Sequence, residues 1–355
     1  MTEDQIEQFA IARLSELGYA YQHGPGIAHD GEHPERASYE QVLLLERLRA
    51  AVRRINPRIP AAAQEEAVKQ VARIASPELL VNNEVFHRML TEGVKVDYQQ
   101  DGNTRGDLVW LVDFTNPANN DLLVVNQYTV VENGRNKRPD VLLFVNGLPL
   151  VLMELKNAAD EKASIRSAYK QVETYKETIP GLFTYNCVVV ISDGLEAKAG
   201  TVSSGFSRYM SWKTSDGKVE ASPLIGQLET LIVGMLNKET LLDLVRHFIV
   251  FERSKKEDPK TGVNTITTVK KIAAYHQYYA VNRAVASTLR ATGYKAPPAA
   301  ASGSVPMVAE SPESYGLPGV SKQATGDRKG GVVWHTQGSG KSLSMVFYTG
   351  KVVLA

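Results

Sequence analysis

The chain of 355 residues lacks the features that mark a secreted or membrane-bound protein. It contains one cysteine, Cys187, which excludes an internal disulfide. No apolar run approaches the roughly 20 residues that a membrane-spanning helix needs. The acidic start, at 1–5, lacks the basic and apolar segments of a signal peptide. These absences predict a cytoplasmic protein without a membrane partner.

An excess of charge of one sign is also missing, because 40 Lys and Arg offset 39 Asp and Glu and leave a net charge of +1. Composition therefore neither indicates nor excludes binding to nucleic acid. Any DNA-binding surface must be a local basic patch. The apolar content of 43% is typical of globular proteins. The length is sufficient for about two domains, each with its own core.

Periodicity predicts a fold of the α/β class, with a mixed sheet flanked by helices. Helical spacing of apolar residues is found at about 3–17, 38–54, 61–74, 161–178, 223–236, 238–251 and 274–291. Strand composition is found within 108–131 and at 140–145, 149–155 and 187–192. Four or five strands are therefore expected.

A charged run at 253–262 is predicted to be a linker, because it is polar and contains a proline. The unit before it, 1–252, has its core at about 105–195. The unit after it, 263–355, contains a stretch rich in Pro, Ala and Ser that cannot pack a core, and a flexible loop is expected at about 295–327.

Charged residues flank a predicted hairpin in the first unit. Asp140 precedes one apolar run, and Glu154 and Lys156 end the next, after a turn signal at 146–149. Side chains two apart in a strand share a face, so Glu154 and Lys156 point the same way. Charged residues are rare in a central strand unless they have a task. The pattern predicts a nuclease centre, where two carboxylates hold a divalent metal against a phosphodiester.

The register of the hairpin decides whether Asp140 joins that face. A regular two-residue turn at 146–147 would place Asp140 and Glu154 on opposite faces. A three-residue loop, which pairs Val145 with Pro149, would set the two acids directly across from each other. We therefore expect an odd-numbered loop or a bulge, with a positive φ at the glycine of the turn or a neighbour.

Given this geometry, Asp140 and Glu154 would bind Mg²⁺, a hard cation that prefers oxygen ligands, with the backbone carbonyl of Leu155 as a further ligand. Lys156 would orient the attacking water or help to deprotonate it, and would offset charge developing on the phosphate. The alternative is a solvated face on which Asp140 caps a strand and Glu154 pairs with Lys156.

Two helices carry supporting candidates. Gln171 and Tyr175 lie one turn apart on the helix that follows, and could touch the DNA backbone, although the same spacing fits an ordinary half-buried helix face. On the first helix, Glu3 and Glu7 have the same spacing. Glu7 is the preferred candidate for completing the metal site.

A phosphate-binding loop is predicted between a strand at about 331–335 and a helix from 342 onward. Its residues are Thr336, Gln337, Gly338, Ser339, Gly340, Lys341 and Ser342. Backbone N–H groups and the helix N-terminus would face the phosphates of ATP, Lys341 would reach the β and γ groups, and Ser342 would bind the accompanying Mg²⁺. Upstream, Gln277 could read the adenine through its amide.

Three segments together resemble the restriction (R) subunit of Type I restriction-modification enzymes. They are residues 119–127, 138–157 and 331–342. The resemblance implies a metal-dependent nuclease domain of the PD-(D/E)xK type, followed by a superfamily 2 helicase-like motor that translocates double-stranded DNA with ATP. It also implies methyltransferase and specificity subunits as partners.

The resemblance assigns roles by position. Asp140, Glu154 and Lys156 match the nuclease motif, and Gln171 and Tyr175 match the family's Gln-x-x-x-Tyr motif. In the second unit, helicase motif I and the adenine-recognising glutamine correspond to Lys341, Ser342 and Gln277.

The expected function is a Mg²⁺-dependent endonuclease joined to the start of an ATP-driven motor. No acidic Walker B box follows Lys341, so the sequence is interpreted as the N-terminal part of a larger subunit that does not complete ATP hydrolysis by itself. Two alternatives remain. One is a non-catalytic DNA-binding or docking fragment, and the other is a nucleotide-binding protein with an incidental acid cluster.

Overall fold

A mixed sheet of six strands forms the centre of the computed structural model, which describes residues 2–157, 164–222, 225–257, 264–294, 325–328, 330–333 and 337–354. The strand order is β1-β4-β7-β8-β9-β10. The bounds are Ala20–His23 (β1), Leu122–Asn126 (β4), Val141–Val145 (β7), Leu148–Leu155 (β8), Val188–Ser192 (β9) and Ala197–Gly200 (β10). β1 runs parallel to β4 and β8 runs parallel to β9, whereas the other neighbours are antiparallel.

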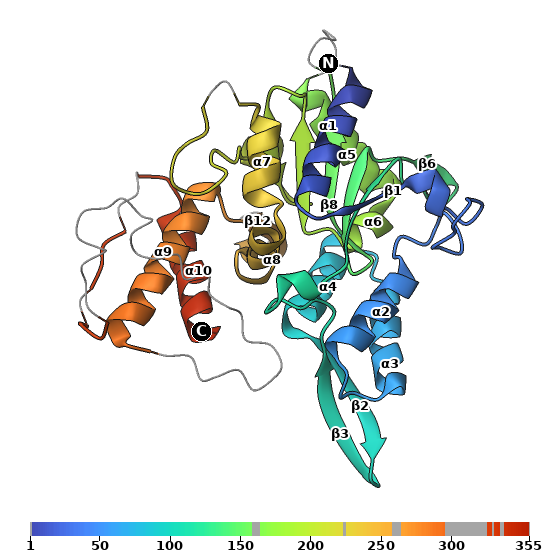
Figure 1. The fold of residues 1–355 in the computed structure, drawn as a ribbon, viewed down its shortest axis with the longest axis horizontal. Coiled ribbons are helices and arrows are strands. Elements are labelled where there is room, and N and C mark those ends of the chain that lie inside the picture. The colour runs from blue at the N-terminus through green and yellow to red at the C-terminus, as the bar shows by residue number, and fades with distance from the viewer. Residues whose placement is uncertain are drawn as a thin grey trace.

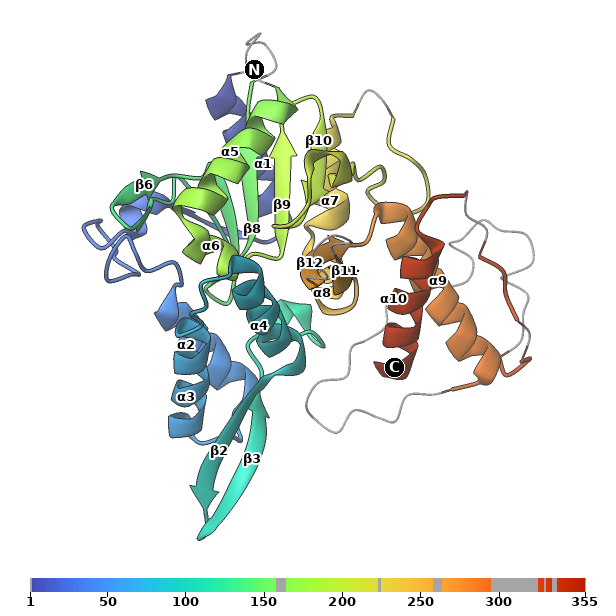
Figure 2. The same cartoon turned by 180° about the vertical axis from the view of Figure 1, so that it is seen from behind.

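Helices cover both faces of this sheet. α1 (Glu3–Glu16) and α7 (Gln227–Met235) lie on the face turned toward the viewer in Figure 1. α5 (Ile165–Thr178) and α6 (Pro180–Thr184) lie on the other face, which Figure 2 shows from the front. A capping box between Thr2 and Gln5 starts α1.

Alternation along the central strands divides the core into two clusters. Val141 and Leu143 of β7 belong to the cluster that includes residues of α1, whereas Leu142 and Phe144 belong to the cluster on the α5 face. In β8, Leu152 also lies on the α5 face. Every residue of β8 is buried, so this strand is central to the sheet.

The turn between β7 and β8 differs from the predicted three-residue loop. Val145 pairs with Leu148 across a two-residue turn, in which Asn146 and Gly147 have φ of 53° and 79°. The positive φ was expected, and the mirror-image twist that it gives suits a tight hairpin. The three-residue loop is therefore wrong.

A bulge restores the register that the turn alone would lose. Pairing shifts between Leu143, opposite Val151, and Phe144, opposite Pro149, so that Leu150 is the extra residue. Beyond the bulge, Val141 faces Met153, and continuing this register by one residue sets Asp140 across from Glu154. The expected alternative of a bulge is confirmed.

Further elements of the first unit lie outside the central sheet. They are α2 (Leu45–Ile55), α3 (Ala61–Ala72), α4 (Leu79–Glu92), α8 (Lys238–His247), the β2–β3 hairpin (Val94–Gln100 and Asn103–Val109) and the β5–β6 ribbon (Val130–Glu132 and Arg135–Lys137). The β2–β3 hairpin projects from the end opposite the N-terminus (Figure 1). The sequence predicted neither α4 nor this hairpin, and α2 begins seven residues later than the expected 38.

The predicted linker is contradicted over the part that is described. Residues 249–257 form β11 (Ile249–Glu257), which pairs along its whole length with β12 (Asn264–Ile272). The charged side chains were misleading because a two-stranded ribbon exposes much of its surface. This strand also ends α8 earlier than the expected 251.

α9 (Tyr275–Thr292) and α10 (Lys341–Leu354) pack side by side at one flank of the molecule. The strand expected at 331–335 is not formed at 331–333, where Val332 is 88% exposed. A strand needs a neighbour to complete its hydrogen bonds, and the described residues provide none for this segment. Residues 334–336 and most of the expected loop at 295–327 lie outside the described residues.

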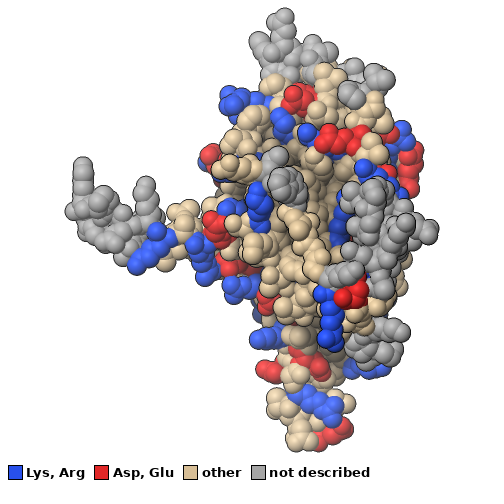
Figure 3. Space-filling model, turned by 90° about the vertical axis from the view of Figure 1, so that its left-hand side faces the viewer, with Lys and Arg blue, Asp and Glu red and all other residues tan. Residues whose placement is uncertain are grey.

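The surface carries both charge signs. Figure 3 shows one face, on which Lys and Arg side chains are interspersed with Asp and Glu instead of forming a continuous basic field. Among the helices that are described, none is both long and apolar enough to cross a lipid bilayer.

Candidate active site

The predicted acid and lysine residues meet at one end of the central strands. Nζ of Lys156 lies 2.9 Å from Oε1 of Glu154 and 3.8 Å from Oδ2 of Asp140. The Glu154 side chain is only 1% exposed, whereas those of Asp140 and Lys156 are 14% and 19% exposed. The structure therefore brings the three residues together, as the register requires.

Backbone groups fix the geometry of this cluster. The backbone N–H of Leu155 donates a hydrogen bond of 2.7 Å to Oδ2 of Asp140, which joins the start of β7 to the end of β8. Lys156 continues β8 by one residue, since its N–H donates to the carbonyl of Ser192. The carbonyl of Leu155, the expected further metal ligand, accepts a hydrogen bond of 2.9 Å from Nζ of Lys156.

Burial and mutual repulsion raise the pKa of both carboxyl groups. Burial, followed by the charge of Asp140, raises the pKa of Glu154 to about 8, against the opposing effect of Lys156. Burial raises the pKa of Asp140 to about 6, although Lys156 and the N–H of Leu155 lower it. Burial lowers the pKa of Lys156, but Glu154 and Asp140 outweigh this effect and raise it above its usual value. The two carboxyl groups therefore favour the positively charged form of Lys156.

The donor set fits a hard divalent cation. Oε2 of Glu154 is buried and has no hydrogen-bond partner among the described residues, so one carboxylate oxygen is available for a ligand. Carboxylate and carbonyl oxygens are the ligands that Mg²⁺ prefers. However, the described residues contain no group of three or more Asp, Glu, His or Cys side chains arranged to hold a metal. Asp140 and Glu154 therefore form a two-carboxylate site.

The first helix approaches the cluster with both of its candidate glutamates. Oε1 of Glu3 lies 2.9 Å from Nζ of Lys156. Glu7 is buried instead against β4, where Nδ2 of Asn126 and Nε2 of Gln127 donate hydrogen bonds of 2.7 Å and 2.9 Å to its carboxylate. Glu3, which the sequence analysis did not prefer, is thus the glutamate that contacts Lys156. The i, i+4 spacing gave no basis for choosing it.

The Gln-x-x-x-Tyr pair belongs to α5. Tyr175 is buried, and its hydroxyl donates a hydrogen bond of 3.4 Å to the carbonyl of Arg138. Burial and the nearby charges of Glu154 and Asp140 raise the pKa of Tyr175. Gln171 is half-buried one turn earlier. Tyr175 therefore supports the acidic site from inside the protein, and its side chain is not presented to a DNA backbone.

The predicted phosphate loop is described from Gln337 onward, whereas Thr336 lies outside the described residues. Gly338 and Gly340 have φ of 82° and 78°, a backbone region that favours glycine. α10 begins at Lys341, with Ser342 next in its first turn, and both are exposed. The loop therefore opens a helix of 14 residues, the context that an N-terminal phosphate site needs.

Gln277 lies against this loop but does not present its amide to a ligand. Its Oε1 accepts a hydrogen bond from the N–H of Ala274, and its Nε2 donates to the carbonyl of Gly340 at 3.0 Å. The neighbouring His276 contacts the carbonyl of Ser339. The structure thus joins the predicted adenine residue to the phosphate loop, although Gln277 contacts backbone instead of offering an open edge to a base.

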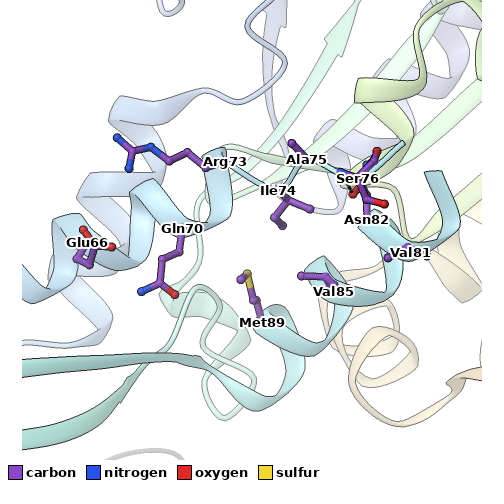
Figure 4. A pocket seen from close by; sticks show the side chains of 10 residues that line it. All are labelled: Glu66, Gln70, Arg73, Ile74, Ala75, Ser76, Val81, Asn82, Val85 and Met89. Atoms are coloured by element: carbon purple, nitrogen blue, oxygen red, sulfur yellow. Dashed lines mark hydrogen bonds between the residues drawn. The ribbon is translucent and has the colours of Figure 1, made fainter. Parts of the chain in front are cut away.

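Two hollows in the surface lie outside the acidic cluster. Figure 4 shows the first, between α3 and α4, where Ile74, Val81, Val85 and Met89 line an apolar floor. The second lies beside the N-terminal half of α9 and is lined in part by Tyr275, His276, Tyr279 and Arg283. Only the second adjoins a predicted functional segment, because His276 contacts the phosphate loop.

Sequence reasoning also missed the residues that hold Glu7. Asn126 ends β4, and Gln127, which follows it, has a positive φ of 54°. Its N–H donates to the carbonyl of Asp140, so this strand end is tied to the cluster. A polar pair directly after four apolar residues was the available signal.

Two family models match the chain, one in each unit. The model of the Type I restriction enzyme R protein N terminus matches residues 1–208, and the model of the SWI2/SNF2 ATPase matches residues 276–355. The endonuclease subunit of the Type I restriction enzyme HindI from Haemophilus influenzae is 40% identical, over 99% of this chain and 30% of that protein.

More distant relatives are also endonuclease subunits of Type I restriction enzymes. A putative type I restriction enzyme MjaIXP endonuclease subunit of Methanocaldococcus jannaschii is 31% identical, over 99% of this chain and 32% of its own length. An EcoprrI endonuclease subunit of Escherichia coli is 33% identical over 41% of this chain. The chain spans about a third of the first two relatives. Because the R-protein model matches more than half of the sequence, this chain belongs to the Type I restriction enzyme R protein family.

Proposed function

We propose that residues 1–252 form a PD-(D/E)xK-type endonuclease domain that hydrolyses phosphodiester bonds of double-stranded DNA with Mg²⁺, within the R subunit of a cytoplasmic Type I restriction enzyme. The observation that carries this proposal is the position of Lys156, whose ammonium lies between Asp140 and the buried Glu154. A solvated ion pair, the alternative interpretation, would not explain a carboxylate that is 1% exposed and has an unpartnered oxygen.

Each residue has a distinct part in the proposed chemistry. Asp140 and Glu154 would hold Mg²⁺, which when bound polarises the phosphate and supplies an activated water. Lys156 keeps its proton, because the neighbouring carboxylates raise its pKa. It therefore offsets the negative charge that grows on the phosphate, and does not act as the base. Tyr175 and Glu7 support the cluster through the carbonyl of Arg138 and through β4.

The second unit is proposed to begin an ATP-driven, helicase-like translocation motor. The loop 336–342 would bind the phosphates of ATP, with Lys341 on the β and γ groups and Ser342 on the accompanying Mg²⁺. The whole subunit would work with methyltransferase and specificity subunits. Support comes from the SWI2/SNF2 match and from the glycine geometry of the loop.

Cleavage of duplex DNA by the assembled enzyme tests the nuclease assignment. Asp140→Ala and Lys156→Ala should each abolish Mg²⁺-dependent cleavage while DNA binding and the folded state, followed by circular dichroism, remain. Glu40→Ala is the matched control, since this glutamate is exposed and forms no ion pair among the described residues. Unchanged cleavage in Asp140→Ala would refute the assignment and would favour a docking role.

A further inference from the structure

The β5–β6 ribbon precedes Asp140, the first acid of the proposed nuclease centre. β5 and β6 pair antiparallel, with Val130 opposite Lys137 and Glu132 opposite Arg135. The turn between them has positive φ at both Asn133 and Gly134, as a tight hairpin requires. The chain then passes directly from β6 through Arg138 to Pro139 and Asp140.

Three cations of this ribbon form no ion pair with any described residue: Arg135, Lys137 and Arg138. We call them the basic ribbon. Arg135 and Arg138 are exposed and Lys137 is half-buried. The one acidic residue of the ribbon, Glu132, offsets at most one of these three charges, and its carboxylate also accepts a hydrogen bond of 2.8 Å from the N–H of Gly181, at the start of α6. The ribbon is thus locally positive in a protein whose net charge is only +1.

The basic ribbon and the acids lie on the same side of the sheet. β6 packs against α5 and β5 against α6, on the sheet face that also holds Leu142 and Leu152. By strand alternation, Asp140 and Glu154 belong to that face. The bond from the Tyr175 hydroxyl to the carbonyl of Arg138 fixes the end of the ribbon to α5. The backbone that carries the cations is therefore anchored next to Asp140.

We propose that Arg135, Lys137 and Arg138 bind phosphate groups of duplex DNA and thereby position the strand whose phosphodiester enters the nuclease centre. The proposal rests on the proposed nuclease function. Guanidinium groups suit phosphate because they can bind it with two parallel hydrogen bonds. Two carboxylates alone would repel a polyanion, so cations beside them are needed to bring DNA close. A chain whose net charge is only +1 must supply them locally.

The salt dependence of DNA binding tests this role without requiring cleavage. The variant Arg135→Ala/Lys137→Ala/Arg138→Ala is compared with Arg58→Ala/Lys95→Ala/Arg105→Ala, which removes the same number of charges from the α2–α3 loop, β2 and β3. The control cations are exposed and form no ion pair among the described residues. Both proteins are titrated with a short blunt-ended duplex in EDTA over a range of salt concentrations.

The ribbon variant should bind roughly tenfold more weakly at low salt, and the slope of log K against log salt should fall by about 0.9 for each phosphate contact that is lost. The control should keep the slope of the unmodified chain. An unchanged slope in the ribbon variant, or equal losses in both variants, would overturn the proposal. A reduced slope combined with normal cleavage by Asp140→Ala would instead leave the DNA site standing and overturn the nuclease assignment.

Discussion

Nζ of Lys156 lies 2.9 Å from Oε1 of Glu154, two positions earlier on the same face of the central strand. The pair is one edge of a triangle whose third corner is Asp140, brought to that face by the bulge at Leu150. Two acids thus share one ammonium at a buried strand end. Their raised pKa values, their supporting contacts and the metal site proposed for them all lead to measurable consequences.

Replacing Glu154 by glutamine should change how stability depends on pH. In the unmodified chain the pKa of Glu154 is raised from 4.5 to about 8 when folded, so the folded state holds this proton more tightly than the unfolded state does. The contribution of Glu154 is therefore fully present below about pH 4.5 and is lost as pH rises to about 8. Each unit of pKa difference corresponds to about 1.4 kcal/mol.

Glu154→Gln should remove this loss. The free energy of unfolding in urea, measured from pH 5 to 8 without metal, should fall less steeply in the variant than in the unmodified chain. Glu40→Gln, at an exposed position, should follow the unmodified chain. Parallel pH curves for Glu154→Gln and the unmodified chain would contradict the raised pKa.

Removing the Glu7 carboxylate should destabilise the chain. Glu7→Ala leaves the side-chain amides of Asn126 and Gln127 without the acceptors that they have at 2.7 Å and 2.9 Å. An unsatisfied buried donor costs about 1–3 kcal/mol. Urea unfolding should show a loss in this range for Glu7→Ala and less than about 0.5 kcal/mol for Glu40→Ala. Equal losses would show that the contacts of Glu7 contribute little.

Lys270 should anchor the β11–β12 hairpin to α4. Its buried ammonium donates to Oδ1 of Asn83 at 2.8 Å and to the carbonyl of Asn186 at 2.9 Å. Lys270→Met keeps the length of the side chain but leaves both acceptors without this donor, at an expected cost of about 1–3 kcal/mol.

The pH dependence of this cost separates the ammonium from simple packing. Burial lowers the pKa of Lys270 from 10.5 to about 8, so above pH 8 the unfolded state binds more protons than the folded state, and stability rises with pH. Lys270→Met lacks this gain. The difference in unfolding free energy between the two proteins should therefore widen from pH 8 to 10, and a constant difference would refute the lowered pKa.

A network involving Lys351 should hold the helix of the phosphate loop against α8. Nζ of Lys351 lies 2.5 Å and 2.6 Å from the two carboxylate oxygens of Asp243, and 2.6 Å from Oδ1 of Asn282 on α9. Both charged side chains are mostly buried. A double-mutant cycle with Asp243→Asn and Lys351→Met should give a coupling free energy of about 1–3 kcal/mol in urea unfolding. Additive effects would contradict a direct interaction.

The sequence predicted the elements whose apolar pattern serves the core of the sheet. β7, β8, β9, α5 and α1 were expected close to where they lie. The turn was harder, since its composition could not separate a three-residue loop from a two-residue turn with a bulge at Leu150. The requirement that Asp140 face Glu154 nevertheless limited the possible turns to a loop with an odd number of residues or a hairpin with a bulge.

Long-range contacts explain the elements that were missed. In α4 the buried face includes Asn83, Glu84 and His87, which interrupt the apolar stripe. Asn83 contacts Lys270, and Glu84 pairs with Arg253, so their partners lie more than 160 residues away in the chain. The β2–β3 hairpin was not predicted because almost all of β3 is exposed and carries no apolar alternation.

Predicted site residues were placed together where local structure governs them, as with Asp140, Glu154 and Lys156. The choice between Glu3 and Glu7 depended on how α1 crosses the end of the sheet, which one helical turn of spacing cannot determine. Gln277 illustrates the same limit. Gln277 lies next to Gly340 because α9 packs on α10, and its side-chain amide donates a hydrogen bond to the carbonyl of Gly340.

Binding of Mn²⁺, a spectroscopic substitute for Mg²⁺, tests most directly whether Asp140 and Glu154 share one metal ion. Titration of the chain at pH 8, followed by electron paramagnetic resonance, should show one site that is lost in Glu154→Gln and in Asp140→Asn. Glu40→Gln should bind as the unmodified chain does. Retention of the site in both Glu154→Gln and Asp140→Asn would contradict a metal centre at this strand end.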